Sequence, residues 1–242
     1  MTTGDGNPPH ATKPPPGWTV NVVATTGSTN DDLAAAATSG AATKTVLVAR
    51  HQTAGRGRLD RRWDAPPGTN LLASLLLDEP ADRPGAAMRS VALAAAAASR
   101  RLAGVSVELK WPNDLLVHER KLAGLLARRV ADGRVVVGIG LNVAWCPDGA
   151  ARLGADIDPL DLLAALLDEW ESLPPSVQAL DDRYEAELGT IGRRVRVDMG
   201  NGDTLVGTAT GLADGGRLVL ATDDGRQRTI DAGDVVHLRG AT

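Results

Sequence analysis

The chain of 242 residues has one cysteine, Cys146, and no phenylalanine. A single cysteine excludes an internal disulfide and an all-cysteine metal site, and it suits a reducing cytoplasm. No uninterrupted apolar run reaches the length of about 18 residues that a membrane-spanning helix needs. The N-terminus has no charged segment followed by an apolar one, so we expect no secretory signal.

An excess of positive charge is also missing. The chain has 26 Lys and Arg against 30 Asp and Glu, a formal net charge of −4. Proteins that bind nucleic acid in general carry an obvious basic excess, so this class is not expected. Hydrophobic residues make up 43% of the chain, which is typical of a globular protein with a sizeable core.

The order of patterns predicts an α+β organisation with two folded parts. Residues 1–17 are rich in Pro, Gly, Thr and Asn, which predicts a disordered tail. Strands are expected over 20–25, 46–49, 71–77, 107–111, 115–117, 122–130 and 135–143, and helices over 28–37, 86–102, 160–170 and 176–188. The first helix should open at Ser28 with a hydroxyl cap, and Asp132-Gly133 should join two strands as a hairpin.

After Gly189 the residue pattern changes to short runs of strand-forming residues separated by Gly, Asp and Asn. Strands are expected over 194–198, 205–212, 218–221, 228–230 and 235–238, which predicts a small all-β barrel or sandwich of about 50 residues. The expected division is therefore a main domain over 18–188 and a β domain over 189–242.

A loop over residues 50–70 concentrates positive charge in an otherwise acidic chain. It holds five arginines between Arg50 and Arg62 against one aspartate. Gly55 and Gly57 would let its backbone approach a ligand closely, and arginine side chains match carboxylate and phosphate oxygens. A solvated basic loop and a small RNA-binding loop are the alternatives. Gln52 and Trp63, at the two ends, add a neutral hydrogen-bonding group and a flat surface for a purine.

The stretch from Lys110 to Gly124 combines two lysines with an Asn-Asp pair after Pro112. The residue before a proline is held extended, so a strand should end at Trp111 and the turn that follows should face a cleft. Taken separately, Asn113-Asp114 is an ordinary turn and Lys121 a solvated strand end. Together with the arginine loop, the stretch indicates an enzyme that handles a carboxylate and a nucleotide phosphate.

Two further motifs are weaker on their own. Gly138-x-Gly140-x-Asn142 lies in a buried strand, where glycine marks a bulge or a close backbone contact, and Asn142 is placed to bind a ribose or phosphate. It is not a dinucleotide fingerprint, since no third glycine opens a helix. Ser28-Thr29-Asn30 reads as a helix cap, and a helix N-terminus also suits a polar ligand group.

These motifs occur in the order found in the biotin–protein ligases, which the chain resembles over residues 18–240. The motifs are Ser28-Thr29-Asn30, Gln52-x-x-Gly55-Arg56-Gly57-Arg58, Lys110-Trp111-Pro112-Asn113-Asp114, Lys121-Leu122-Ala123-Gly124 and Gly138-x-Gly140-x-Asn142. The resemblance implies a mixed sheet flanked by helices, the class II synthetase-like core shared with lipoate ligases, followed by an SH3-like barrel. It is closest to monofunctional members without an N-terminal DNA-binding domain, so no DNA partner is expected.

The resemblance also implies the chemistry and its residues. ATP would activate biotin as biotinyl-5′-AMP, with Mg²⁺ accompanying the nucleotide and no tightly bound metal, and a carrier-protein lysine would then take the biotinyl group. The catalytic residues would be Lys121, Arg58 and Asp114. The biotin site would comprise Ser28, Thr29, Asn30, Gln52, Gly55, Arg56, Gly57, Arg58, Lys121 and Gly124. The adenylate site would comprise Arg56, Arg58, Trp63, Lys110, Asn113 and Asn142.

Some questions stay open at this stage. Asp114 would either bind Mg²⁺ through water or help to deprotonate the incoming lysine. The expected partner is the carrier domain of an acetyl-CoA, other acyl-CoA or pyruvate carboxylase, with no membrane involved, and the enzyme would be a monomer or a weak dimer in the cytoplasm. The competing interpretations are a lipoate ligase and a non-catalytic protein that binds RNA or a partner through the arginine loop and the β domain.

Overall fold

A seven-stranded mixed sheet forms the centre of the computed structural model, which describes residues 13–200, 202–231 and 233–238. The strand order is β1-β2-β3-β7-β6-β5-β4; β1 and β2 run parallel and each other neighbouring pair runs antiparallel. The strands are β1 (Thr19–Thr26), β2 (Thr45–Gln52), β3 (Leu71–Leu77), β4 (Glu108–Lys110), β5 (Asp114–Val117), β6 (Arg120–Arg129) and β7 (Val135–Leu141). The predicted tail lies outside the described residues as far as residue 12.

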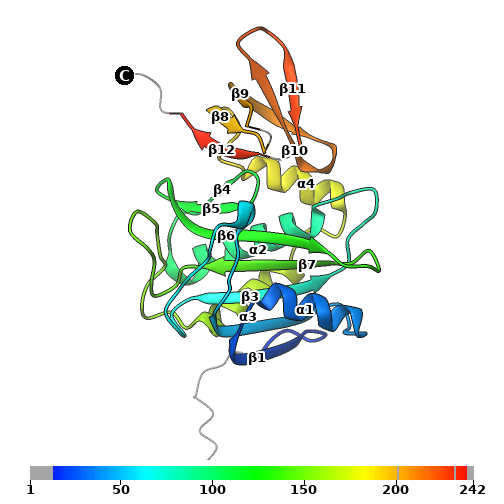
Figure 1. Cartoon of the computed structure of the whole chain (residues 1–242), viewed down its shortest axis with the longest axis vertical. Coiled ribbons are helices and arrows are strands. Elements are labelled where there is room, and N and C mark those ends of the chain that lie inside the picture. The colour runs from blue at the N-terminus through cyan, green and yellow to red at the C-terminus, as the bar shows by residue number, and fades with distance from the viewer. Residues whose placement is uncertain (1–12, 201, 232, 239–242) are drawn as a thin grey trace, which may run out of the picture.

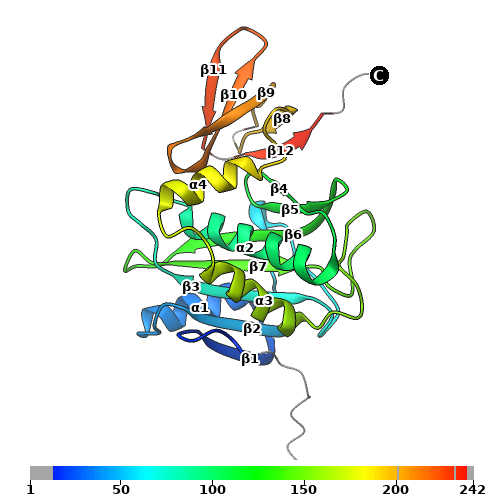
Figure 2. The same ribbon diagram turned by 180° about the vertical axis from the view of Figure 1, so that it is seen from behind.

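Helices cover the two faces of this sheet differently (Figures 1 and 2). Helix α1 (Thr29–Thr38) packs on one face against β2, β3 and β7, whereas α2 (Ala86–Ala103) and α3 (Pro159–Glu171) pack together on the other. Helix α2 stops at Gly104, whose φ of 64° is the left-handed conformation that glycine adopts without a steric penalty. Helix α3 starts where the Asp158 carboxylate accepts a hydrogen bond from the Leu160 N–H at 2.7 Å.

The two-residue period of the strands decides which side chains meet which layer. In β3, Leu71, Ala73 and Leu75 join the large core that includes α2 and α3, while Leu76 joins a smaller cluster that includes α1. Because side chains alternate along a strand, Ser74 shares the α1 face with Leu76. By the same alternation, Gly138 and Gly140 of β7 lie on the α1 face. The side of the sheet without the two long helices therefore carries the small and polar positions.

The last part of the chain forms a second, five-stranded antiparallel sheet with the order β11-β10-β9-β8-β12 (Figure 1). Its strands are β8 (Arg194–Asp198), β9 (Thr204–Ala213), β10 (Arg217–Thr222), β11 (Gln227–Ile230) and β12 (Asp234–His237). Helix α4 (Val177–Ala186) lies between the two sheets in both views. The predicted fold class is confirmed, and the small sheet is consistent with an SH3-like domain. The described residues contain no helix with both the length and the apolar composition needed to cross a bilayer.

The structure refines several local predictions. The Asp132-Gly133 hairpin is confirmed, with Gly133 at φ 89° between β6 and β7. The predicted hydroxyl cap is wrong, because Ser28 occupies the N-cap position of α1 while its side chain makes no capping hydrogen bond. Strand β6 already begins at Arg120, so Lys121 is part of the strand rather than a residue before it. The arginine loop contains a short 3₁₀ turn, η1 (Arg58–Asp60).

A polar cluster joins the second sheet to β4. Thr190 Oγ1 accepts a hydrogen bond from the Trp111 N–H at 3.0 Å and lies 3.2 Å from His237 Nε2. Arg193 Nη1 lies 3.3 Å from His237 Nδ1 and can only donate. The imidazole is therefore neutral, with its proton on Nε2 facing Thr190. Burial lowers the pKa of His237 from 6.5 to about 4, and the charges of Arg193 and Lys110 act in the same direction.

We expect this histidine to make the protein less stable in acid. Between pH 6.5 and about 4 the unfolded chain binds a proton at His237 that the folded chain does not, so the free energy of unfolding falls as the pH is lowered through that range. Urea unfolding at pH 7.5 and pH 4.5 should show a smaller decrease for His237→Gln, which has no titrating ring, than for the parent. Equal decreases in the two proteins would contradict this role.

Candidate active site

A cavity with a volume of about 310 Å³ opens on the α1 face of the large sheet. Its floor comes from β6 and β7, and the arginine loop borders it. Nearly all residues that the sequence assigned to the site line this cavity, namely Ser28, Thr29, Asn30, Gln52, Arg56, Gly57, Arg58, Trp63, Asn113, Asp114, Lys121, Gly124 and Asn142. All five motifs thus contribute residues to one cavity.

Two assigned residues do not line the cavity. Gly55 lies just behind its wall, where its carbonyl accepts a hydrogen bond from the Trp63 N–H at 3.0 Å. A Cβ at Gly55 would come within 2.4 Å of the Trp63 carbonyl oxygen, so glycine is needed for the loop to fold back on itself. The charge of Lys110 instead helps to lower the pKa of His237, which lies where the second sheet meets β4. Its predicted role near phosphate stays a prediction.

Two glycines form a seat for Trp63 on the cavity floor. A Cβ at Gly140 would lie 2.4 Å from the indole, and one at Gly124 would lie 3.3 Å from it. Lys121 Nζ lies 5.6 Å from the centre of the Trp63 ring, within the range of a cation–π interaction. The indole Nε1 is buried and has no hydrogen-bond partner among the described residues. Any larger residue at position 140 would displace the tryptophan.

Opposite charges meet near the starts of β5 and β6. Lys121 Nζ lies 2.7 Å from Asp114 Oδ1, and Asp114 pairs with Gly124 across the two strands. Arg58 Nη1 donates to Asn113 Oδ1 at 3.2 Å, and Asn113 Nδ2 donates to the Leu125 carbonyl at 2.7 Å. Burial lowers the pKa of Arg58 below its usual value, while the charges of Asp234 and Asp114 oppose that shift. Arg58 and Lys121 therefore lie near the Asp114 carboxylate in the cavity wall.

The arginine loop is attached to the body at both sides. Arg56 forms an ion pair with Asp31 of α1, and Arg61 forms one with Asp234 of β12. Arg58 Nη1 also donates to the Gly233 carbonyl at 3.2 Å. Sequence reasoning missed Gly233 and Asp234, because no local signal connects a position in the small sheet with a loop more than 170 residues earlier.

The opposite end of the cavity is polar but uncharged. Gln52 Oε1 accepts a hydrogen bond from the Thr29 N–H at 2.8 Å, and the Thr29 hydroxyl oxygen lies 3.1 Å from the same oxygen. Ser28 is buried there, with its hydroxyl unused by the helix. Ser74, also missed, lies behind Thr29 at 2.7 Å. Its signal was available, since it is the one polar residue in the apolar run 71–77.

Asn142 lines the cavity and also forms hydrogen bonds that hold the neighbouring chain segments in place. Its Nδ2 donates to the Ala151 carbonyl at 3.0 Å, and its Oδ1 lies 3.3 Å from Asn70 Nδ2. Asn70, which sequence reasoning missed, accepts hydrogen bonds from the Val143 and Trp145 N–H groups. The two amides hold the chain where it leaves β7, and a contact of Asn142 with phosphate or ribose stays a prediction.

Metal-binding side chains are not clustered here. In the parts of the chain described, no three His, Cys, Asp or Glu residues lie close enough together to hold an ion. The carboxylates that line the cavity are Asp64, Asp114 and Asp234, so a cation that arrives with a nucleotide would meet separate carboxylates rather than a clustered site.

Sequence comparisons identify the two parts of the chain separately. Residues 22–143 match the Biotin/lipoate A/B protein ligase family, and residues 190–238 match the Biotin protein ligase C terminal domain. A biotin–[acetyl-CoA-carboxylase] ligase of Mycobacterium tuberculosis is 40% identical, with 92% of this chain and 91% of that protein covered. A protein of the same name from Paracoccus denitrificans is 33% identical over 75% of this chain and 85% of its own length.

Structural comparison gives the same family. The biotin protein ligase from Aquifex aeolicus, solved in complex with biotin and ATP, has a TM-score of 0.76 and 25% identity, and the match covers 92% of this chain and 99% of that one. The residues that carry the family motifs converge on one cavity here. The chain therefore belongs to the Biotin/lipoate A/B protein ligase family and is a biotin–protein ligase of that family.

Proposed function

We propose that this cavity binds biotin and ATP together, forms biotinyl-5′-AMP and presents it to the lysine of a carboxylase carrier domain. The observation that carries the proposal is the division of one cavity into two ends. Ser28, Thr29 and Gln52 form a neutral hydrogen-bonding end, and Arg58 and Lys121 form a cationic end. Biotin has the matching halves, an uncharged urea ring and a carboxylate.

The first step brings together two anions, the biotin carboxylate and the triphosphate of ATP. The carboxylate oxygen attacks the α-phosphorus, the bond to the β-phosphate oxygen breaks, and pyrophosphate leaves. The protein contributes mainly position and electrostatic stabilisation. Lys121 is suited to the oxygens that gain charge at the α-phosphate, and Arg58 to the adjoining phosphate side. Mg²⁺ bound with ATP would offset the remaining repulsion between the two anions.

The second step needs an uncharged amine. The carrier lysine attacks the acyl carbon of the mixed anhydride, an amide bond forms, and AMP leaves. Asp114 lies beside Lys121 at the cavity wall and is placed either to accept the proton of that amine or to contact Mg²⁺ through water. The arginine loop with Trp63 covers the adenylate and limits its hydrolysis before the carrier arrives.

The carrier is a domain of a biotin-dependent carboxylase, the class of protein that the relatives' names specify. We place the reaction in the cytoplasm, with a monomer or a weak dimer as the active form and no DNA-binding role. Strand β1 forms one edge of the large sheet and is open to pairing with another strand.

The decisive experiment combines the purified chain, biotin, Mg-ATP and a purified carrier domain. We expect biotin-dependent release of pyrophosphate and a carrier heavier by one biotinyl group in the mass spectrum. A carrier whose target lysine is replaced by arginine should stay unmodified, and lipoate should not replace biotin. If the carrier kept its mass while the enzyme was folded and ATP was saturating, the proposal would be wrong.

A further inference from the structure

A row of three residues crosses the large sheet beneath the neutral end of the cavity. Ser74 of β3 pairs with Gly138 of β7, and Gly138 pairs on its other side with Leu126 of β6. Ser74 is completely buried within the otherwise apolar strand β3. A buried hydroxyl needs hydrogen-bond partners to offset its lost hydration. The partners of Ser74 therefore indicate the role of this side chain.

The side chain of Asn30 lies along this row, directly over Gly138. A Cβ at Gly138 would come within 2.4 Å of Asn30 Oδ1, which explains a glycine in the middle of a buried strand. Asn30 Nδ2 donates to the Leu126 carbonyl at 3.0 Å, and Oδ1 lies 2.7 Å from Ser74 Oγ. Only the NH₂ side of the amide can donate to a carbonyl. The carboxamide is therefore oriented with its oxygen toward Ser74.

This orientation fixes the single hydrogen of Ser74. Ser74 Oγ lies 2.7 Å from both Asn30 Oδ1 and Thr29 Oγ1. Asn30 Oδ1 can only accept, so the Ser74 hydrogen points to Asn30. The contact between Ser74 and Thr29 is too short for two lone pairs to face each other. The Thr29 hydrogen therefore points to Ser74, and the longer contact of 3.1 Å between the Thr29 hydroxyl and Gln52 Oε1 contains no hydrogen.

The consequence reaches the cavity through Thr29 and Gln52, which both line it. The remaining lone pair of Thr29 Oγ1 can only accept a hydrogen bond from a ligand. Gln52 Oε1 is held by the Thr29 N–H at 2.8 Å, which leaves Gln52 Nε2 as a donor with no hydrogen bond to another described residue. An acceptor next to a donor is complementary to a ligand with an N–H next to a C=O.

We propose that Ser74 is a positioning residue that, through Asn30 and Thr29, sets this donor–acceptor pattern and so selects the N–H and C=O of a cyclic urea. The proposal rests on the function proposed above, since it assigns the neutral end of the cavity to the biotin ring. Ser74 touches neither substrate. It decides which way the Thr29 hydroxyl points before biotin binds, so that no reorientation is needed on binding.

Ser74→Ala tests the proposal by direct measurement of biotin binding in a calorimeter and of steady-state kinetics. The loss of a buried hydrogen-bond partner predicts a Kd for biotin raised about tenfold or more, whereas the KM for ATP should stay within about twofold. The matched control is Ser99→Ala, which removes an equally buried hydroxyl that donates only to the Ala95 carbonyl within α2. That control should leave both constants unchanged.

A second measurement tests whether Ser74 sets the direction of the Thr29 hydroxyl hydrogen or only fills space in the core. Wild-type enzyme should bind poorly a biotin analogue in which the ring N–H facing Thr29 is replaced by oxygen, because two acceptors would then meet. In Ser74→Ala the Thr29 hydroxyl can rotate to donate, so the ratio of analogue to biotin Kd should fall by about fivefold or more. Ser74→Cys, of similar volume with a weak S–H donor, should give an intermediate ratio and serves if the alanine variant does not fold.

The outcomes separate the two proposals. An unchanged biotin Kd in folded Ser74→Ala or Ser74→Cys, a parallel rise in the KM for ATP, or an unchanged analogue ratio would each overturn the role of Ser74. Wild-type enzyme that releases no pyrophosphate in the presence of biotin would instead overturn the proposed function. Biotin binding without turnover in the wild type would still allow the Kd comparison.

Discussion

Lys121→Ala is expected to slow formation of the adenylate by about a thousandfold, because it removes a preorganised cation from the place where negative charge develops. The ammonium is positioned by three features of the site. It lies 2.7 Å from Asp114 Oδ1 and 5.6 Å from the Trp63 ring centre, and its alkyl chain passes over Gly124. Pyrophosphate release at saturating biotin and ATP measures the effect on this step directly.

The fold should survive this change, since the Lys121 side chain is 40% exposed and the Asp114 side chain, although its Oδ1 is buried, stays 19% exposed. Lys44→Ala is the matched control. Its side chain is 35% exposed and is also paired with a carboxylate, that of Glu171, but it lies outside the cavity lining. We expect Lys44→Ala to keep near-normal pyrophosphate release. A folded Lys121→Ala enzyme with a rate within tenfold of the parent would show that the cation is not needed for activation.

Lys121→Arg adds information on geometry. It preserves the charge but replaces a compact ammonium with a larger planar fork, which has to fit beside Trp63 and Asp114. We expect it to recover only part of the lost rate. Full recovery would mean that charge alone is required at this position, whereas a rate as low as that of alanine would mean that the location of the charge is decisive.

Patterns within a few residues allowed most of the fold to be predicted. Asp132-Gly133 between two apolar runs defines a hairpin by local turn chemistry, and the change of residue pattern after Gly189 reflects the many short strands of a small β domain. The site residues could be predicted because their motifs combine charged residues and glycines that a strand or helix without a binding role does not need. Thirteen of the assigned residues line the cavity.

What local patterns could not supply is strand register and the contacts that depend on it. Lys110 and Lys121 are only eleven residues apart in one motif-rich stretch, yet Lys121 lines the cavity and Lys110 affects His237 where the second sheet meets β4. The face that each lysine occupies depends on the pairing of β4 with β5 and on the bulge between β5 and β6. One residue of slippage reverses the face of every side chain in a strand. The row from Ser74 to Leu126 is likewise a product of register.

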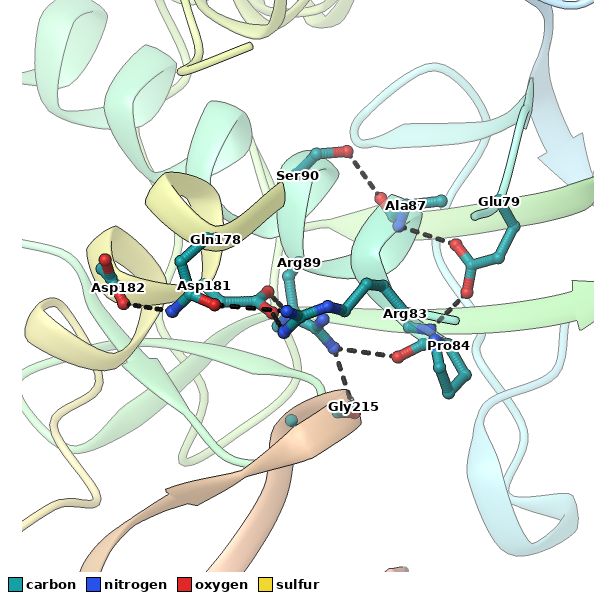
Figure 3. A network of polar contacts seen from close by, with 12 residues as sticks. Glu79, Arg83, Pro84, Ala87, Arg89, Ser90, Gln178, Asp181, Asp182 and Gly215 are labelled. Atoms are coloured by element: carbon teal, nitrogen blue, oxygen red, sulfur yellow. Dashed lines mark hydrogen bonds and ion pairs between the residues drawn. The ribbon is translucent and has the colours of Figure 1, made fainter. Parts of the chain in front are cut away.

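The contact between α2, α4 and the small sheet is another feature that no local pattern predicts (Figure 3). Arg89 of α2 is only 4% exposed, and its Nε donates to Asp181 Oδ1 of α4 at 2.7 Å. Its Nη1 lies 3.2 Å from the carbonyls of Pro84 and Gly215, the latter in the turn before β10. Neighbouring Gly216 accepts a hydrogen bond from Trp111 Nε1 at 2.9 Å. The turn is thus attached to α2 and to the motif that carries Asn113 and Asp114.

Asp181→Ala is expected to destabilise the protein by about 3–5 kcal/mol, because it leaves the buried Arg89 guanidinium without its counterion. The remaining groups near Arg89 replace little of that charge. Arg89 Nη2 already lacks a hydrogen-bond partner in the described part of the chain, and the two carbonyls are neutral acceptors. For a chain of this size, such a loss corresponds to a melting temperature lower by about 6–20 °C.

Asp182→Ala is the control on the same helix. Asp182 accepts a hydrogen bond from Gln178 Nε2 at 2.8 Å on the exposed side of α4, and an exposed contact of that kind contributes about 1 kcal/mol or less. The double variant Arg89→Met with Asp181→Leu removes both charges and fills the space with apolar atoms, so it should recover most of the lost stability. Recovery would show that the cost of Asp181→Ala is that of an unpaired buried charge. A double variant as unstable as Asp181→Ala would show instead that the hydrogen bonds from Arg89 to Pro84 and Gly215 hold the small sheet in place.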